Sequence, residues 1–279
     1  MLSTHKQVPI FTIIVAVFNG RETLKRCLES FIHQTYPEKE LIVIDGGSDD
    51  GSVEIIQAYQ DQITYWESQP DRGLAHAWNK ALDKAAGDWI YFLGCDDYLW
   101  SNDTLELVAN FIQEISEPVK LIHGKVVRFL PNGELLDTQG QPWQEMQKKF
   151  MNLMAIHHQS VFQHKSLFED YSYFDESFRL TCDYELLLRS LKQENPVFIN
   201  EVIAGVFLGG MANRAMNRLK FFQEISRAIK KLDAPVSPLL LVFCYIRIYI
   251  RMTLTIILGE ETTDKFSFFI LKLGNHLPR

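Results

Sequence analysis

Two adjacent carboxylates, Asp96 and Asp97, stand just beyond a short apolar run at residues 89–93. The run is rich in aromatic and β-forming residues and is bounded by glycines, which predicts a buried strand. Acids past the carboxyl end of such a strand lie where α/β sheets bind ligands. Because neighbouring carboxylates repel each other, a divalent cation is one natural partner for them. The structural alternative is one acid that caps a helix starting near Asn102 and one that is merely solvated.

Further acids follow other predicted strands. These strands occupy residues 10–18, 41–44, 64–66 and 89–93, with helical patterns between them. Such alternation is typical of βαβ units and of a mostly parallel α/β sheet flanked by helices. Asp45 follows the second strand and Asp71 the third. Because parallel strands end at the same edge of a sheet, we expect these acids and the Asp96–Asp97 pair to line one ligand crevice.

The composition narrows the class of protein. The chain has 279 residues, of which 47% are hydrophobic and 23% charged, as in an ordinary globular protein. Its four cysteines form no CxxC pair, so neither a disulfide framework nor a zinc site is indicated. Free thiols fit a reducing compartment, and the N-terminus lacks the basic region of a signal peptide. We therefore expect a cytoplasmic protein, and no nucleic-acid partner.

The usual glycine-rich phosphate cradles are absent from the sequence. No GxxxxGK[ST] motif occurs, and neither the turn after Phe18 nor residues 45–51 match GxGxxG. A diphosphate ligand would then need a metal ion or basic side chains to neutralise it. Asp96 and Asp97 can supply oxygen ligands for Mn²⁺ or Mg²⁺, which we take as the expected cofactor.

Six segments along the chain carry a resemblance to one protein family. Four of them match closely: TIIVAVFNG (12–20), ELIVIDGGSDDGS (40–52), PDRGLAHAWNKAL (70–82) and GDWIYFLGCDDYL (87–99). Looser matches follow at HHQSVF (157–162) and TCDYELLLR (181–189). In this order, the segments resemble family 2 glycosyltransferases of the GT-A fold. The resemblance implies a Rossmann-like sheet and an inverting, metal-dependent transfer of sugar from a nucleotide-diphospho sugar. A UDP-sugar is the favoured donor.

The resemblance also implies a role for each matched residue. The residues that would bind the nucleotide sugar are Ala16, Phe18, Asn19, Asp45, Asp71, Arg72 and Asp96. Asp97 would bind the metal ion, and Asp96 would share that duty. The motif reads Cys95-Asp96-Asp97 instead of Asp-X-Asp, so the division of labour between the two acids stays open.

A base that removes the acceptor's proton is expected near residue 183. The pattern DYELLLR implies that Asp183 is this base, with Glu185 as the runner-up. Asp183 falls in the first turn of a helix predicted from about residue 182 to 192. The structural alternative is an acid that compensates the helix dipole, which would lower its pKa. His158 is expected either on the acceptor and diphosphate side of the site or simply in the core.

The expected reaction is glycosyl transfer to a saccharide or a lipid-linked saccharide in cell-surface or exopolysaccharide biosynthesis. One alternative is a sugar-1-phosphate nucleotidyltransferase, which has a related sheet and two metal-binding acids. Such an enzyme would need a glycine-rich basic loop after the first strand, and residues 18–21 are too short for it. The other alternative is a catalytically inactive binding protein that keeps the fold.

The C-terminal residues differ in character from the rest. We expect a catalytic domain at 1–212, with a nucleotide half at about 8–100 and an acceptor half at 101–212, then a helical extension at 213–279. Residues 214–251 hold eight lysines and arginines and two acids, although the whole chain has a net charge of −7. This balance favours an anionic partner surface.

Helices are expected in this extension at 217–232 and 239–258. The longest uncharged run, residues 234–246, has 13 residues, whereas a spanning helix needs ~20. Residues 214–258 are therefore expected to meet a membrane peripherally, on the inner face of the plasma membrane, through a helix in the interfacial plane. Packing on the catalytic domain or on a partner subunit, including a homo-oligomer, is the alternative.

Overall fold

A computed structural model describes residues 10–152, 155–209, 215–236, 238–259 and 262–263. The strands are β1 (Phe11–Val17), β2 (Lys39–Asp45), β3 (Tyr65–Ser68), β4 (Trp89–Gly94), β5 (Tyr98–Leu99), β6 (Leu121–Phe129), β7 (Leu135–Gln139), β8 (Val161–His164) and β9 (Val197–Phe207). The α-helices are α1 (Arg21–Ile32), α2 (Ser52–Ala58), α3 (Leu74–Leu82), α4 (Thr104–Glu114), α5 (Trp143–Asn152), α6 (Ser166–Tyr171), α7 (Cys182–Leu191), α8 (Ala215–Lys231) and α9 (Pro238–Leu258). Two short 3₁₀ segments, η1 and η2, cover Gln60–Gln62 and His158–Ser160.

All of these strands join one sheet, in the order β3-β2-β1-β4-β8-β6-β9-β5, with β7 paired to β6. The strands β3, β2, β1 and β4 are parallel, as the alternation of strand and helix predicts. Beyond β4 the sheet is mixed, because β8 runs antiparallel to both β4 and β6 while β9 runs parallel to β6. The α/β fold with helices on both faces is therefore confirmed, and the strictly parallel part is the half that ends at Gly94.

The first strand shows why its sequence is apolar at almost every position. Successive side chains of a strand point to opposite faces of the sheet. Ile14 packs with α3 and α7 on one face, whereas Ile13 and Val15 pack with α1 and α4 on the other. All three side chains have 0% exposure. A strand covered by helices on both faces needs apolar residues at every position, because neither face meets water.

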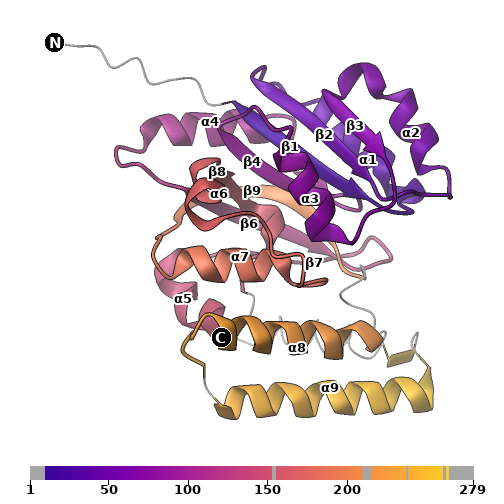
Figure 1. The fold of residues 1–279 in the computed structure, drawn as a ribbon, viewed down its shortest axis with the longest axis vertical. Helices are drawn as coiled ribbons and strands as arrows, with labels where there is room; N and C mark the ends of the chain where they lie inside the picture. The colour runs from indigo at the N-terminus through magenta and orange to yellow at the C-terminus, as the bar shows by residue number, and fades with distance from the viewer. Residues whose placement is uncertain (1–9, 153–154, 210–214, 237, 260–261, 264–279) are drawn as a thin grey trace.

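The C-terminal helices form further layers on one side of the sheet. Figure 1 shows α8 between α7 and α9, with α9 as the outer layer. Ile225, Ala228 and Ile229 of α8 are buried in the same apolar cluster as α7 and α3. Of the expected alternatives for the basic extension, packing on the catalytic domain therefore holds for α8. The domain boundary after residue 212 itself stays a prediction.

Ion pairs reinforce this attachment. The Lys231 ammonium lies 2.8 Å from the carboxylates of both Asp175 and Glu185. The guanidinium of Arg227 donates a hydrogen bond to the Ser177 carbonyl at 2.7 Å and lies over the Phe178 ring. The helix α8 is thus fixed to the segment that leads into α7.

Replacing Ile225 by Ala tests whether α8 belongs to the cooperative core. Because Ile225 is 1% exposed, we expect Ile225→Ala to lower the free energy of unfolding by about 2–5 kcal/mol. The measurement is urea unfolding followed by tryptophan fluorescence and circular dichroism. The control is Val242→Ala on the exposed face of α9, which should change stability by no more than about 0.5 kcal/mol. A main transition that Ile225→Ala leaves unmoved would show that α8 folds separately.

Candidate active site

The register of three parallel strands brings the predicted acids to one edge of the sheet. Ala16, near the end of β1, pairs with Ile44 of β2 on one side and with Gly94 of β4 on the other. Val17 pairs with Asp45. The half-buried Ala16 is thus flanked by the loop that begins at Asp45 and by the turn that carries Asp96 and Asp97. The expected convergence of these loops on one edge is present.

Asp45 is fully buried and holds the loop after β2 in shape. One of its carboxylate oxygens accepts hydrogen bonds from the amides of Gly47 (3.0 Å) and Ser48 (2.9 Å) and from the Ser68 hydroxyl (2.6 Å). The other accepts from the Ser48 hydroxyl at 2.5 Å. This carboxylate therefore fixes the end of β2 to the end of β3. A direct contact between Asp45 and a nucleotide base stays a prediction.

Asp71 and Phe18 meet at Gly46. A Cβ atom at Gly46 would lie 2.9 Å from Asp71 Oδ2 and 3.4 Å from the Phe18 ring, so a side chain at this position would push the Asp71 carboxylate aside. The other Asp71 oxygen accepts from the Gly73 amide at 2.8 Å. The Phe18 side chain is 60% exposed, so it offers an aromatic face at the same edge as the Asp71 carboxylate.

Asn19 connects the first loop to the second. Its backbone has a φ of 53°, in the left-handed region that asparagine tolerates better than most residues. Its side-chain oxygen accepts from the Asp49 amide at 3.1 Å, and its own amide donates to the Ser48 hydroxyl at 2.8 Å. The predicted donor-binding residues Phe18, Asn19, Asp45 and Asp71 therefore belong to one set of interlocked loops.

The two acids after β4 turn back over Gly94. A Cβ atom at Gly94 would lie 2.5 Å from Asp97 Oδ2 and 2.9 Å from Asp96 Oδ1. Both carboxylates thus face the same small volume, which a side chain at position 94 would fill. Asp97 is 1% exposed, and Asp96 is half-buried.

Burial raises the pKa of the Asp97 carboxyl well above its usual range, and the neighbouring Asp96 raises it further. Burial also raises the pKa of Asp96, against the opposing effect of Arg26. Two desolvated carboxylates at one point are costly unless positive charge compensates them.

A divalent cation fits this acid pair. Among the residues that the structure describes, no group of three or more His, Cys, Asp or Glu side chains could hold a metal ion. Mg²⁺ is commonly bound by one or two carboxylates, with substrate phosphates and water as the other ligands. The two converging carboxylates suit that kind of site, in which the substrate contributes to the coordination.

Three residues that the sequence did not single out hold the acid pair in place. The Gln159 side-chain amide donates to Asp97 Oδ2 at 2.9 Å, and the Phe207 backbone amide donates to Asp97 Oδ1 at 3.1 Å. Arg26 of α1 donates to the Asp96 carbonyl at 2.5 Å, and its guanidinium lies 4.1 Å from the centre of the Phe207 ring. Gln159 lies within the segment HHQSVF, next to His157 and His158. Nothing in the sequence distinguishes Arg26 from other cations on α1.

Arg72 links the donor-side loops to the segment before α7. Its guanidinium pairs with Glu176 at 2.8 Å, and its carbonyl accepts from Arg179 at 2.5 Å. Arg179 also packs 3.6 Å from the Cβ position of Gly73. The loop that carries Asp71 and the loop that leads to Asp183 are therefore in direct contact.

Asp183 lies in the first turn of α7, half-buried, with a raised pKa. Desolvation raises the pKa of its carboxyl to about 6, and Glu224 adds to the increase although the Tyr184 amide opposes it. The pKa of Asp183 is thus raised by burial, which is the opposite direction from the one that the helix-dipole alternative predicts. A carboxyl with a pKa near neutrality is suited to accept a proton at physiological pH.

Glu224 of α8 shapes the approach to Asp183. Its two carboxylate oxygens accept from the amides of Arg179 (3.0 Å), Leu180 (2.9 Å) and Thr181 (3.1 Å), and from the Thr181 hydroxyl (3.1 Å). These donors precede the first turn of α7, so Glu224 fixes the backbone that leads into the helix. An acid from the C-terminal helices thus positions the loop before the expected base.

Glu185 has a different environment from the one expected for a base or an acceptor contact. Its side chain has 0% exposure and pairs with Arg189 and Lys231, each at 2.8 Å. Both of its carboxylate oxygens are thus paired with cations of the chain itself, one with Arg189 and the other with Lys231. Glu185 joins α7 to α8 through these pairs, and its expected role as a base or an acceptor contact stays a prediction.

His158 also belongs to the core and does not line the site. It is 3% exposed and stacks on Phe92, with Trp78 and Phe174 around it. The Gln163 amide nitrogen lies 2.8 Å from its Nε2, and burial lowers its pKa to about 3, so the ring is neutral. Of the two expectations for His158, the core residue is the correct one.

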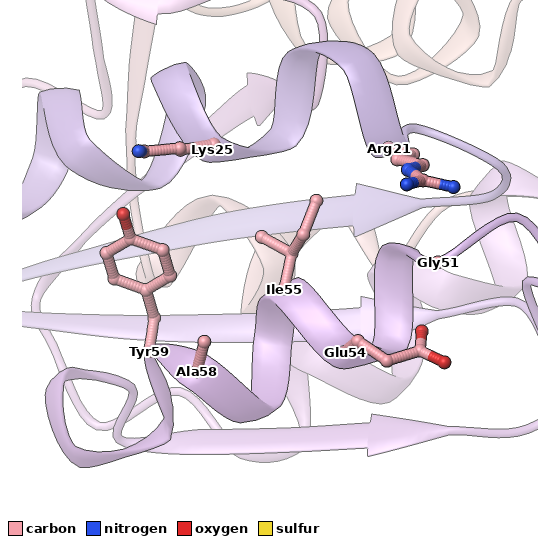
Figure 2. A pocket seen from close by; sticks show the side chains of 7 residues that line it. All are labelled: Arg21, Lys25, Gly51, Glu54, Ile55, Ala58 and Tyr59. Atoms are coloured by element: carbon pink, nitrogen blue, oxygen red, sulfur yellow. The ribbon is translucent and has the colours of Figure 1, made fainter.

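A separate open groove of about 670 Å³ lies between α1 and α2. Figure 2 shows that it starts beside Arg21 and Gly51 and runs to Tyr59. None of the predicted site residues lines it, and its polar side chains include Lys25, which pairs with Glu29. The groove is therefore distinct from the acid cluster at the carboxyl edge.

Comparison with known proteins identifies the family. The family profile described as glycosyl transferase family 2 matches residues 12–168. The chain belongs to this family. A relative from Mycobacterium tuberculosis, a PGL/p-HBAD biosynthesis glycosyltransferase, is 29% identical over 221 residues, which cover 75% of this chain and 82% of the relative. The family assignment argues against the nucleotidyltransferase alternative.

Solved structures of glycosyltransferases share the fold. Staphylococcus aureus TarS in complex with UDP-GlcNAc matches with a TM-score of 0.60 and 18% identity, over 88% of this chain and 73% of that one. The mannosyltransferase PcManGT from Pyrobaculum calidifontis, in complex with GDP-Man and Mn²⁺, matches with a TM-score of 0.59 and 18% identity, over 88% of this chain and 71% of that one. These likenesses confirm the GT-A type of fold that the sequence motifs imply.

The raised pKa of Asp183 predicts a pH dependence for this glycosyltransferase. A base must be deprotonated, so kcat/KM should fall about tenfold per pH unit below the Asp183 pKa of about 6. Glu224→Gln removes a negative charge that raises this pKa, so the acidic limb should move to lower pH. The measurement is a pH profile of kcat/KM for both proteins. A flat profile down to pH 5 would count against Asp183 as the base.

Loss of the Glu224 carboxylate should also loosen the start of α7. Because Glu224→Ala leaves several backbone donors without an acceptor, we expect it to lower the free energy of unfolding by about 1–3 kcal/mol. The neighbouring exposed Gln223 is a matched control, since Gln223→Ala should be within about 0.5 kcal/mol of wild type. Chemical unfolding measures both. Equal stability of the two variants would mean that the Glu224 hydrogen bonds do not stabilise the fold.

Proposed function

We propose that this family member is an inverting, metal-dependent glycosyltransferase that uses a nucleotide-diphospho sugar, with a UDP-sugar favoured. The observation that carries the proposal is the register of β2, β1 and β4, which brings the Asp45 loop and the Asp96–Asp97 turn to one edge. The loop from Asp71 to Gly73 lies at the same edge, because the Asp71 carboxylate packs against Gly46. Arg179, which precedes Asp183 in the chain, donates to the Arg72 carbonyl and so links this loop to the segment that leads to Asp183.

The donor's base and ribose would bind among the interlocked loops. The exposed Phe18 ring can stack on a base, and the Asp71 carboxylate beside Gly46 can accept hydrogen bonds from it or from the ribose. Asp45 and Asn19 hold these loops in position, and Ala16 leaves space at the end of β1. A fold shared with TarS bound to UDP-GlcNAc supports a nucleotide-sugar donor of this kind.

Asp96 and Asp97 would hold Mn²⁺ or Mg²⁺ together with the donor diphosphate. When bound, such a cation acts as a Lewis acid that stabilises the negative charge developing on the departing phosphate. Gln159 and the Phe207 amide keep the Asp97 carboxylate aimed at the volume over Gly94. The Mn²⁺ in the mannosyltransferase complex supports a divalent ion.

Asp183 would take the proton from the attacking hydroxyl of the acceptor. Its pKa of about 6 leaves it mostly ionised near pH 7 and still basic enough to be protonated in the transition state. One base of this kind suffices for a single displacement, which inverts the anomeric configuration. General-base help of this kind is typically worth ~10²–10⁴-fold in rate.

The acceptor we propose is a saccharide or a lipid-linked saccharide in surface or exopolysaccharide assembly. The relative named for PGL/p-HBAD biosynthesis supports a biosynthetic role. We also propose a cytoplasmic location, since the described cysteines are free thiols, which suit a reducing compartment.

Donor binding can be tested without knowing the acceptor. A ligand that binds only the folded state increases the free energy of unfolding by mass action, by about 2.7 kcal/mol when its concentration is a hundred times Kd. The melting temperature rises as a result. We expect a UDP-sugar to raise the melting temperature of the protein more than GDP- or dTDP-sugars do, and only when Mn²⁺ or Mg²⁺ is present. Thermal shift over this panel is the measurement. A response without metal would contradict the metal dependence.

Substitution of the acids separates binding from chemistry. Asp97→Ala should abolish the metal-dependent thermal shift and reduce transfer at least ~10³-fold, because the site loses a principal oxygen ligand. Asp183→Asn should keep the donor-induced shift but lose ~10²–10⁴-fold in transfer rate. The exposed Asp61, in η1, provides a control, and Asp61→Ala should behave as wild type. Unchanged transfer in both site variants would rule out the assignment.

A further inference from the structure

The face of α9 that points away from α8 is apolar along most of its length. Its exposed apolar side chains are Leu239, Val242, Phe243, Ile246, Tyr249, Ile250, Ile256 and Ile257, each more than half exposed. From Leu239 to Ile250 they recur every three or four residues, and the exposed Thr253 separates Ile250 from Ile256 on the same stripe of the helix. Such a long exposed apolar stripe is unusual for a soluble monomer and indicates a partner or a membrane surface.

The opposite face of α9 packs on α8. Tyr245 lies edge-on to the Phe222 ring at 5.4 Å, and its hydroxyl is 3.2 Å from that of Ser226. Ile248 on the same face is 8% exposed. Since α8 is itself fixed to the catalytic domain by Lys231 and Ile225, α9 lies along the body of the protein and does not project from it (Figure 1).

Positive charge lies beside the apolar stripe. The sequence of α9 contains no acidic residue, and its exposed Arg247 is 5.8 Å from the Phe243 ring. On α8, Lys220 and Lys230 are exposed. A second copy of this chain would bring an equally basic surface against this one, so charge disfavours a dimer through α9. An anionic surface complements it.

Length and composition alone would also allow a spanning helix. In the described part of the chain, Leu241–Leu258 is the helical stretch that is long and apolar enough to cross a membrane, and 6% of it is buried. To span the membrane, however, α9 would have to separate from α8 or pull the lysines of α8 into the bilayer. Each lysine would cost ~2.5–3.5 kcal/mol at the bilayer centre. Packing against α8 therefore favours a helix in the plane of the surface.

We propose that α9 docks the enzyme on an anionic lipid bilayer, with its apolar stripe among the acyl chains and Arg247 at the level of the headgroups. The side of the molecule formed by α8 and α9 then faces the membrane. This docking surface goes beyond the proposed reaction, because it depends on neither the donor nor the base.

Flotation of the full chain with vesicles tests the proposal. We expect binding to vesicles of phosphatidylcholine with phosphatidylglycerol at 3:1, and weaker, salt-independent binding to phosphatidylcholine alone. A triple variant, Phe243→Ser with Ile246→Ser and Ile250→Ser, should bind at least about a hundredfold less, since it loses three apolar side chains that would insert among the acyl chains. Arg247→Gln should bind the anionic vesicles about fivefold less, and added salt should reduce that difference.

The matched control is Leu135→Ser, which removes an apolar side chain that is 58% exposed on β7. It should bind vesicles as wild type does. Because all the altered positions are exposed, the variants should also keep the unfolding midpoint and the donor-induced thermal shift of the wild type. Binding therefore reads out the docking surface separately from the catalytic site.

Three results would overturn the proposal. The first is a wild-type chain that does not bind anionic vesicles, or a triple variant that binds as well as wild type. The second is a dimer, seen by sedimentation, that the triple substitution dissociates, which would make a second copy the occupant of the stripe. The third is a chain that alkaline carbonate fails to release from the membranes of expressing cells, which would indicate a spanning helix.

Discussion

The repulsion between Asp96 and Asp97 is the constraint around which this structure is arranged. The two carboxylates face one volume over Gly94, and burial raises the pKa of both. Donors from three distant parts of the chain compensate them in part: Arg26, Gln159 and the Phe207 amide. The segment before β8 and the end of β9 therefore do more than extend the sheet, because Gln159 and the Phe207 amide fix the Asp97 carboxylate.

A second set of charges connects the C-terminal helices to the chemistry. Glu224 organises the backbone before Asp183, while Lys231 pairs with the buried Glu185 two residues beyond it. The base that we propose thus lies on a helix whose first turn depends on α8. If α9 lies on a membrane, the same helix pair joins the docking surface to the loop that carries the base.

Much of the fold could be predicted from the sequence, because strands and helices leave a local periodicity. The strands expected at residues 10–18, 41–44, 64–66 and 89–93 are present as β1, β2, β3 and β4. The edge position of the acids followed from parallel strands alone. Gln159, Arg26 and Glu224 could not be predicted in this way, because each acts on a residue between 43 and 70 positions away in the chain. No local pattern records such a pairing.

The sequence by itself determined the α/β class, the family, and the set of acids that meet at the carboxyl edge, since these depend on residue type and short-range spacing. Only the tertiary structure decided which candidates are buried and by what they are paired. It put His158 among aromatic rings, tied Glu185 to two cations, and raised the pKa of Asp183 to about 6 by desolvation. Desolvation and charge pairing depend on every element packed around a group, and the neighbouring residues in the sequence do not specify those elements.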